Sequence, residues 1–174
     1  MTGSYLTRTI LLLLAIGSAF PGTACRKRPQ PAKPLAASAA FAQPSVTINK
    51  QTWYVELATT PAARYQGLSW RTQLPAGAGM LFVYPKADNL DYCMRGCLIP
   101  LDIAFISPKL RIITIHTMTV EEDLAGRRVY SSAAPAQFVL EVPAGSLAHA
   151  GAKVGDLVQL DMPDASKALS DPRR

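Results

Sequence analysis

The sequence predicts a mainly β protein: a compact antiparallel sandwich or barrel-like domain with one or two short helices. Short runs rich in β-branched and aromatic residues recur from residue 45 to residue 162, and turn residues separate them. Only two stretches carry helical signals. A chain of 174 residues that is 49% hydrophobic is long enough to bury one core. We therefore expect a single β-rich domain at 45–162.

Residues 1–25 are typical of a secretory signal. Arg8 precedes an apolar run at 10–20, and small residues follow it up to Cys25. This run is shorter than the ~20 residues that a membrane-spanning helix needs. Ala24-Cys25 resembles the site at which bacterial lipoproteins are cut and acylated on the cysteine, although Gly22 stands where that motif usually has leucine. Lipidation of Cys25 and simple cleavage after Ala24 both stay open, and both predict export to the cell envelope or secretion.

Residues 26–44 are rich in proline and alanine and lack apolar periodicity, which is typical of a flexible spacer. The charge of the chain is concentrated before the domain. Residues 1–44 hold five of the 18 basic residues and none of the 12 acidic ones, so 13 basic and 12 acidic residues remain in 45–174. Because the domain is nearly neutral, the net charge of +6 does not indicate nucleic-acid binding.

The β-like runs of the domain follow one another at short intervals. Strands are predicted at 46–48, 52–58, 80–84, 101–107, 111–117, 137–142 and 156–161, with turns at 85–89, 107–109 and 155–156.

Two short helices interrupt this pattern. Thr60 is a good N-cap and Pro61 suits the first helical position, so we expect a helix from Pro61 through Leu68. A helix that reached Arg71 would place Arg64 and Arg71 on one face. A second turn of helix is predicted at 144–150, ended by Gly151. Residues 163–174 are expected to form a loose tail.

Five sequence segments resemble motifs of one protein family and occur in the same order as in that family: VELATTPAARYQGLSWR, GMLFVY, CMRGCLIPLDIAF, FVLEVPAG and GAKVGDLVQL. Together they resemble the uncharacterised bacterial and archaeal domain of unknown function 192 over roughly residues 52–160. This resemblance implies a small, mainly β, often exported domain with no established reaction, cofactor or substrate.

The resemblance also marks recurrent polar positions, which are the candidate ligand-binding residues Arg64, Arg71, Arg95, Asp102, Glu141 and Asp156. In the central motif, the commonest family form is Trp-Met-Lys-Asn-Thr, whereas this chain has Cys93-Met94-Arg95-Gly96-Cys97. Guanidinium groups match carboxylates and phosphates through paired N–H donors, so the three arginines predict a small anionic ligand or an envelope partner. The competing interpretation is that they pair with Asp102, Glu141 or Asp156 and only fix the fold.

Cys93 and Cys97 are the two cysteines of the domain. In an oxidising compartment an even number of cysteines predicts a disulfide. Four residues of extended strand span roughly 13 Å, whereas a disulfide needs Cα atoms within about 7 Å. Residues 94–96 must therefore turn, which Gly96 permits.

An alternative function is a thiol/disulfide or soft-metal protein. Copper(I) or zinc would suit sulfur and imidazole ligands from Cys93, Cys97, His116 and Met118. The C-x-x-x-C spacing differs from the C-x-x-C of catalytic dithiols, and there is no nucleophile elbow, H-E-x-x-H motif or phosphate loop.

Function is therefore predicted as non-catalytic binding of a ligand or envelope partner by an exported domain that is lipid-anchored if Cys25 is acylated. No cofactor and no nucleic acid are expected, and contact with a membrane is expected only through such an anchor.

Overall fold

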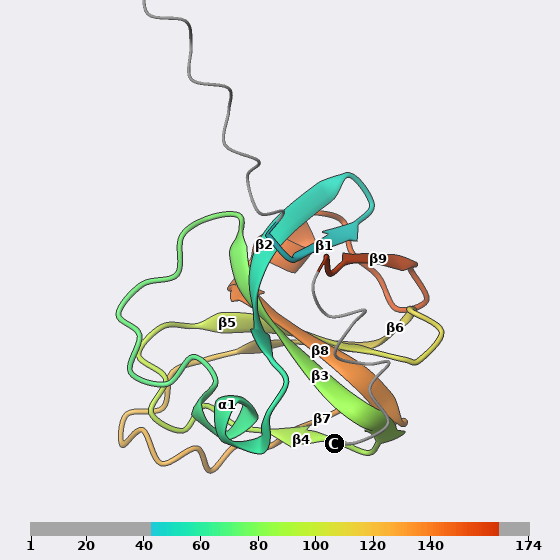
Figure 1. Ribbon diagram of the computed structural model, residues 1–174. Coiled ribbons are helices and arrows are strands. Elements are labelled where there is room, and N and C mark those ends of the chain that lie inside the picture. Colours follow the sequence, from blue (N-terminus) through green and yellow to red (C-terminus); the bar gives the residue numbers. More distant parts are fainter. Residues whose placement is uncertain (1–42, 164–174) are drawn as a thin grey trace, which may run out of the picture. The chain divides into compact units, whose positions relative to one another are not determined.

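The computed structural model describes residues 43–163 as a curled, mainly β domain (Figure 1). The predicted leader at 1–25, nearly all of the spacer at 26–44 and the tail from residue 164 lie outside the described residues. The strands are β1 (Ser45–Ile48), β2 (Gln51–Ala58), β3 (Ala78–Asp88), β4 (Asp91–Tyr92), β5 (Leu101–Ile106), β6 (Ile112–Met118), β7 (Tyr130–Ser131), β8 (Ala136–Pro143) and β9 (Val158–Asp161). The helices are α1 (Pro61–Gln66) and α2 (Ser146–His149). The predicted mainly β class with two short helices is confirmed.

Seven strands form one sheet in the order β6-β5-β8-β3-β2-β1-β9, and β4 pairs with β7 in a small separate ribbon. All pairs are antiparallel except β2–β3, which is parallel. Parallel neighbours need a crossover connection. Here that connection carries α1 and the long segment before β3, so this pair departs from the expected antiparallel arrangement.

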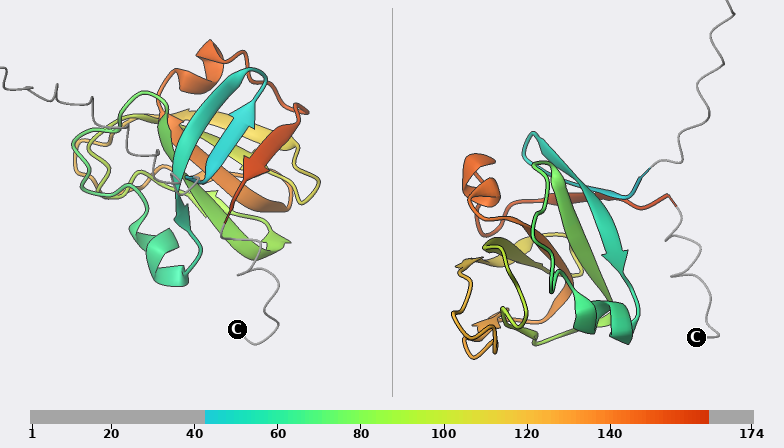
Figure 2. Two further views of the ribbon diagram at one scale, coloured as in Figure 1. Left: turned by 45° about the horizontal axis from the view of Figure 1, so that its top comes forward. Right: turned by 90° about the vertical axis from the view of Figure 1, so that its left-hand side faces the viewer.

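The sheet curls until its two edges meet at one corner. Ile112 N–H donates to the Asp156 carbonyl at 3.0 Å, and Val158 N–H donates to the Leu110 carbonyl at 2.8 Å. In Figure 2 the cyan strands β1 and β2 and the red β9 lie across from the yellow and orange strands β6 and β8. The result is a half-barrel that is joined at this corner.

Both faces of the sheet are buried. Along β3, Leu81 and Val83 point into the curl with Trp53, whereas Met80 and Phe82 point to the outer face. The segments that follow β2 and β4 cover this outer face, which explains why all six residues of β5 are buried. A sheet covered on both faces has nearly continuous apolar strands, as the sequence showed for β3, β5 and β8.

Helix α1 begins as predicted but ends earlier. The Thr60 hydroxyl accepts a hydrogen bond from Ala63 N–H, and Pro61 opens the helix. It stops at Gln66 because Gly67 turns the chain at φ +48°. The expectation that a helix aligns Arg64 with Arg71 is therefore wrong.

The turn predicted at 85–89 is also wrong, because β3 continues to Asp88. Its pairing with β8 is irregular between Val83 and Asp88. Pro85 has no N–H to donate and is accommodated in this irregular stretch.

Candidate functional site

A pocket of about 410 Å³ lies on the outer face of the sheet, beside α1. One wall is formed by α1 and the residues after it, and the other by β4 and the loop that follows β4. Strands β3 and β8 contribute the remaining lining residues. The charged, hydroxyl and thiol groups among the lining residues belong to Arg64, Tyr65, Ser69, Tyr84, Asp91, Tyr92, Cys93, Arg95, Cys97 and Glu141. The pocket therefore combines both signs of charge with aromatic and thiol groups.

Arg64 is held in place by backbone oxygens and an aromatic ring. Its Nη1 donates to the carbonyls of Thr59 at 2.7 Å and Val83 at 3.0 Å. The guanidinium carbon lies 4.7 Å from the centre of the Tyr84 ring, within the range of a cation–π contact. No carboxylate of residues 43–163 forms an ion pair with Arg64. Its charge is therefore positioned but not neutralised.

Arg95 is fixed in a similar way on the opposite wall. Its Nη2 donates to the Tyr65 carbonyl at 2.9 Å, and its guanidinium stacks on the Tyr65 ring at 4.0 Å. The Arg95 carbonyl accepts a hydrogen bond from the Ser69 hydroxyl at 2.9 Å, which ties this loop to the segment after α1. Arg95 also lacks an ion pair within the part of the chain that the structure describes.

Glu141 brings a buried carboxyl to the same pocket. It lies on β8 between Met80 of β3 and Ile103 of β5, and only 5% of the residue is exposed. Burial raises the pKa of this carboxyl to about 8, so it is mostly protonated at pH 7. No group of residues 43–163 forms a hydrogen bond with the Glu141 carboxyl. Every completely buried side-chain polar atom in that range does have a hydrogen-bond partner. The Glu141 carboxyl oxygens are therefore not completely buried, and they open into the pocket that Glu141 lines.

The aromatic residues make one wall of the pocket rigid. The Tyr84 and Tyr92 hydroxyls are hydrogen-bonded at 3.0 Å. The Tyr92 ring also meets the Phe82 and Phe105 rings edge to face, at centroid distances of 5.2 and 5.6 Å. Burial is the main cause that raises the pKa of Tyr92, so its hydroxyl stays protonated at neutral pH. The Tyr92 hydroxyl on this wall is therefore neutral.

Cys93 and Cys97 both line the pocket, and both are free thiols in the structure. Residues 94–97 form a tight turn in which Cys97 N–H donates to the Met94 carbonyl at 3.0 Å. Gly96 adopts φ +65° there, and a Cβ at this position would lie 3.1 Å from the Trp70 ring. The pKa of Cys97 is raised to about 11, mainly by burial and to a smaller extent by the nearby Glu141 and Cys93.

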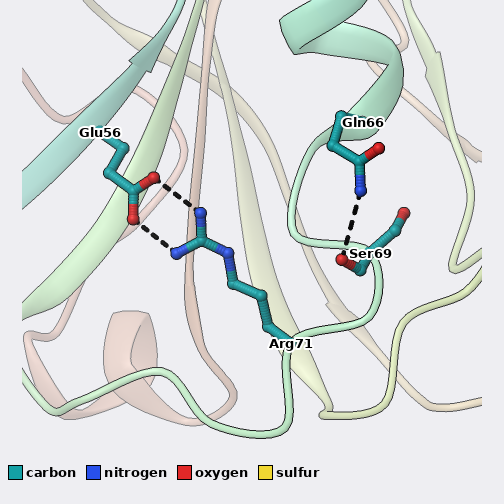
Figure 3. Close-up of polar contacts among 4 residues, drawn as sticks. All are labelled: Glu56, Gln66, Ser69 and Arg71. Atoms are coloured by element: carbon teal, nitrogen blue, oxygen red, sulfur yellow. Dashed lines mark hydrogen bonds and ion pairs between the residues drawn. The ribbon is translucent and has the colours of Figure 1, made fainter.

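Three of the six candidate ligand-binding residues lie outside the pocket. Arg71 forms a bidentate ion pair with Glu56, at 2.5 and 2.6 Å, next to the Gln66–Ser69 contact drawn in Figure 3. The hydrogen bonds from Arg71 hold the pKa of Glu56 below its usual value. This pair ties β2 to the segment after α1.

Asp102 and Asp156 also have local partners. The Asp102 carboxylate accepts hydrogen bonds from the Thr117 hydroxyl at 2.8 Å and from Leu147 N–H at 3.0 Å. Asp156 accepts a hydrogen bond from Lys153 N–H at 2.9 Å in the turn before β9. The structure thus brings Arg64, Arg95 and Glu141 together and separates Arg71, Asp102 and Asp156 from them.

The alternative metal ligands do not converge. His116 Nε2 is within 3.0 Å of the Ser131 carbonyl, and Met118 is completely buried. Neither of them lines the pocket that holds Cys93 and Cys97. Among residues 43–163 there is no group of three or more His, Cys, Asp or Glu placed to hold a metal ion.

The aromatic residues Tyr65, Tyr84 and Tyr92 were missed by sequence reasoning. Tyr65 directly follows the candidate residue Arg64, and Tyr92 directly precedes the candidate residue Cys93. This adjacency in the sequence was the only signal that could have identified the two tyrosines. Tyr84 had no local signal, because its contact with Arg64 joins β3 to α1.

This curled sheet with an outer-face pocket defines a small β domain that carries a candidate ligand site. The chain belongs to the domain of unknown function 192 family (DUF192): the family model, described as an uncharacterised ACR, matches residues 44–160. The recognition made from the five sequence segments is therefore confirmed. No curated protein matches the chain.

Two solved structures share the fold. One is a protein of unknown function from Novosphingobium aromaticivorans, with 33% identity and a TM-score of 0.61, covering 66% of this chain and 83% of that one. The other is described as a putative transcription regulator from Sinorhizobium meliloti, with 30% identity and a TM-score of 0.59, covering 67% of this chain and 91% of that one.

Proposed function

We propose that this chain binds a small anionic molecule in the outer-face pocket and catalyses no reaction there. The observation that carries the proposal is the pair of guanidinium groups of Arg64 and Arg95, fixed in one pocket without a carboxylate partner among the described residues. Such groups match carboxylates and phosphates. A volume of about 410 Å³ falls within the ~300–1,000 Å³ of small-molecule sites.

The lining side chains favour binding over catalysis. When reduced, Cys97 is a neutral thiol at pH 7 because its pKa is raised to about 11, and neither a neutral thiol nor a disulfide sulfur is a nucleophile. None of the described residues that line the pocket is a histidine. Glu141, whose pKa is raised to about 8, can exchange a proton near neutral pH, but no activated nucleophile stands beside it among the described lining residues.

Removal of either pocket guanidinium is expected to weaken anion binding by about tenfold or more, because a hydrogen bond to a charged group contributes about 1.5–3 kcal/mol. The variants are Arg64→Gln and Arg95→Gln, titrated with inorganic phosphate and with acetate by calorimetry. Arg127→Gln is the matched control, since Arg127 pairs with Asp123 outside the pocket. Unchanged affinity in both pocket variants would contradict the proposal.

DNA binding is not proposed, although one solved relative is described as a putative transcription regulator. Residues 45–174 carry 13 basic and 12 acidic side chains, so the domain lacks the charge excess typical of DNA-binding domains.

We further propose that residues 1–25 direct export and that Cys25 is acylated, so that the domain is held at a bacterial membrane. The leader pattern and Ala24-Cys25 support this proposal. Within residues 43–163, no helix is long and apolar enough to cross a bilayer.

In the envelope, Cys93 and Cys97 are proposed to form a disulfide. The turn at 94–97 and the positive φ of Gly96 support it, because they shorten the path between the two cysteines. Both thiols would lose their hydrogen atoms to a thiol–disulfide oxidant of that compartment, which would be reduced in turn.

One measurement tests processing and oxidation together. Intact-mass spectrometry of the full chain, isolated from the membranes of a bacterial host, is expected to show a polypeptide that begins at acylated Cys25. The domain should lack two hydrogen atoms relative to its reduced form. Cys25→Ser is the control for acylation. An unprocessed chain that begins at Met1 would contradict export, and two titratable thiols without reductant would contradict the disulfide.

A further inference from the structure

We infer that the ligand of this pocket is a small zwitterion, whose oxyanion binds Arg64 and Arg95 and whose ammonium group binds Glu141. This inference rests on the proposed function, because it names the class of ligand that the same pocket takes. It follows from two guanidinium groups and one buried acid that line one cavity without pairing with each other.

The first step concerns the separation of the charges. Arg64 and Arg95 are held at the walls by backbone carbonyls and tyrosine rings, and neither pairs with Glu141. Burial raises the pKa of Glu141, and neither arginine is among the causes that change it. The pocket therefore has a cationic part and a separate acidic part.

The second step concerns Glu141 itself. Only 5% of the residue is exposed, and its carboxyl is not hydrogen-bonded by residues 43–163 and opens into the pocket. Its neighbours across the strands, Met80 and Ile103, are apolar and give it no partner. A buried carboxyl in this state gains a partner only from what enters the pocket.

Two kinds of ligand group could approach Glu141: an uncharged acceptor, to which the acid would donate, or an ammonium group, which would pair with the carboxylate. With a pKa of about 8, ionising Glu141 at pH 7 costs about tenfold in affinity. Close charge pairs at desolvated sites contribute at least as much, roughly ten- to hundred-thousand-fold in measured cycles. The ammonium ligand is therefore favoured, and its binding releases a proton.

The other charged and titratable groups around the pocket do not replace Glu141 in this role. They are Arg64 and Tyr65 from α1, Tyr84 from β3, Asp91 and Tyr92 from β4, and Cys93, Arg95 and Cys97 from the loop. The arginines keep their charge, and burial raises the pKa of Tyr92 and Cys97, so these two stay neutral. Asp91 is exposed and accepts a hydrogen bond from the Ser131 hydroxyl at 2.6 Å.

Matched ligands test the inference on the full chain. L-alanine and L-lactate differ only in an ammonium or a hydroxyl group, and so do phosphoethanolamine and 2-hydroxyethyl phosphate. In at least one pair, the ligand with the ammonium group is expected to bind at least about tenfold more tightly than the ligand with the hydroxyl group. If this is the first pair, the preferred oxyanion is a carboxylate, and if it is the second pair, the preferred oxyanion is a phosphate. Calorimetry gives both affinities and the protons released.

Glu141→Gln is the informative variant, because the amide keeps the shape of the acid but cannot ionise. It is expected to remove the preference for the ammonium ligand. In the unmodified chain, the affinity for this ligand should rise by up to about tenfold per pH unit between about pH 6 and pH 8, because Glu141 must lose its proton. The Glu141→Gln affinity should be flat over that range for L-alanine. For the phosphate ligands, whose own second ionisation falls near pH 6, the difference between the two profiles is compared. Both profiles are measured in a Cys93→Ser, Cys97→Ser background, so that neither a thiol nor a disulfide of the pocket affects them.

Three outcomes are distinguished. Equal or tighter binding of the hydroxyl members overturns the inference but leaves anion binding in place. An ammonium preference that survives Glu141→Gln and does not change with pH also overturns it. If no member of either pair binds, the proposed function fails together with the inference.

Discussion

Trp53→Ala is expected to lower the free energy of unfolding by about 3–5 kcal/mol, the cost of truncating a large buried aromatic side chain. Trp53 lies on β2 and is 1% exposed, among the apolar side chains inside the curl of the sheet. The same buried cluster includes Ile48 from β1 and Leu140 from β8. The indole therefore belongs to a core built from several strands, and its loss leaves a cavity that these strands cannot close.

Urea unfolding of the full chain, followed by circular dichroism, measures this effect. Tyr54→Ala is the matched control: Tyr54 is the next residue of the same strand, points away from the curl and is 59% exposed. The control is expected to change stability by no more than about 0.5 kcal/mol. Equal losses in the two variants would mean that the inner cluster is not the principal core.

Asp102→Ala is expected to lower the free energy of unfolding by about 2–4 kcal/mol and to leave anion binding unchanged. Asp102 is 1% exposed, and its carboxylate accepts the hydrogen bonds from Thr117 and from the backbone N–H of Leu147 at the start of α2. Without the carboxylate, a buried N–H has no partner, which costs about 1–3 kcal/mol by itself. The loss of the Thr117 hydrogen bond adds to this.

This variant separates a structural role for Asp102 from the ligand-binding role that the family resemblance implied. Asp161→Ala is the control, since Asp161 is an exposed aspartate at the end of β9. Urea unfolding gives the stability of both variants, and phosphate titration gives their binding. Weaker phosphate binding with unchanged stability would return Asp102 to the ligand site.

Much of the fold was predictable because its signals are local. Thr60 and Pro61 start α1 through contacts within one turn, and Gly96 permits the turn at 94–97. The apolar runs of β3 and β8 predicted buried strands. The end of α1 at Gln66 and the continuation of β3 through Pro85 were not predicted, because neighbouring segments of the folded chain decide both.

The candidate site was predictable in part. Arg64, Arg95 and Glu141 were marked by the resemblance, but nothing local showed that they line one pocket. Arg71 pairs with Glu56 across 15 positions, and Asp102 bonds to Leu147 across 45 positions. Partners at such distances along the chain are set by strand register, which the pattern of residue types leaves open.

Residue types and their order are enough to predict the β class, the start of α1, the near-neutral charge of the domain and a turn between the two cysteines. Which polar residues share a cavity depends on how distant strands and loops pack, and this packing makes Glu141 a buried acid. Glu141 faces the outer side of the sheet, where water would be expected. The segments that cover this face shield the carboxyl from most of the solvent, so its environment depends on contacts between distant parts of the chain.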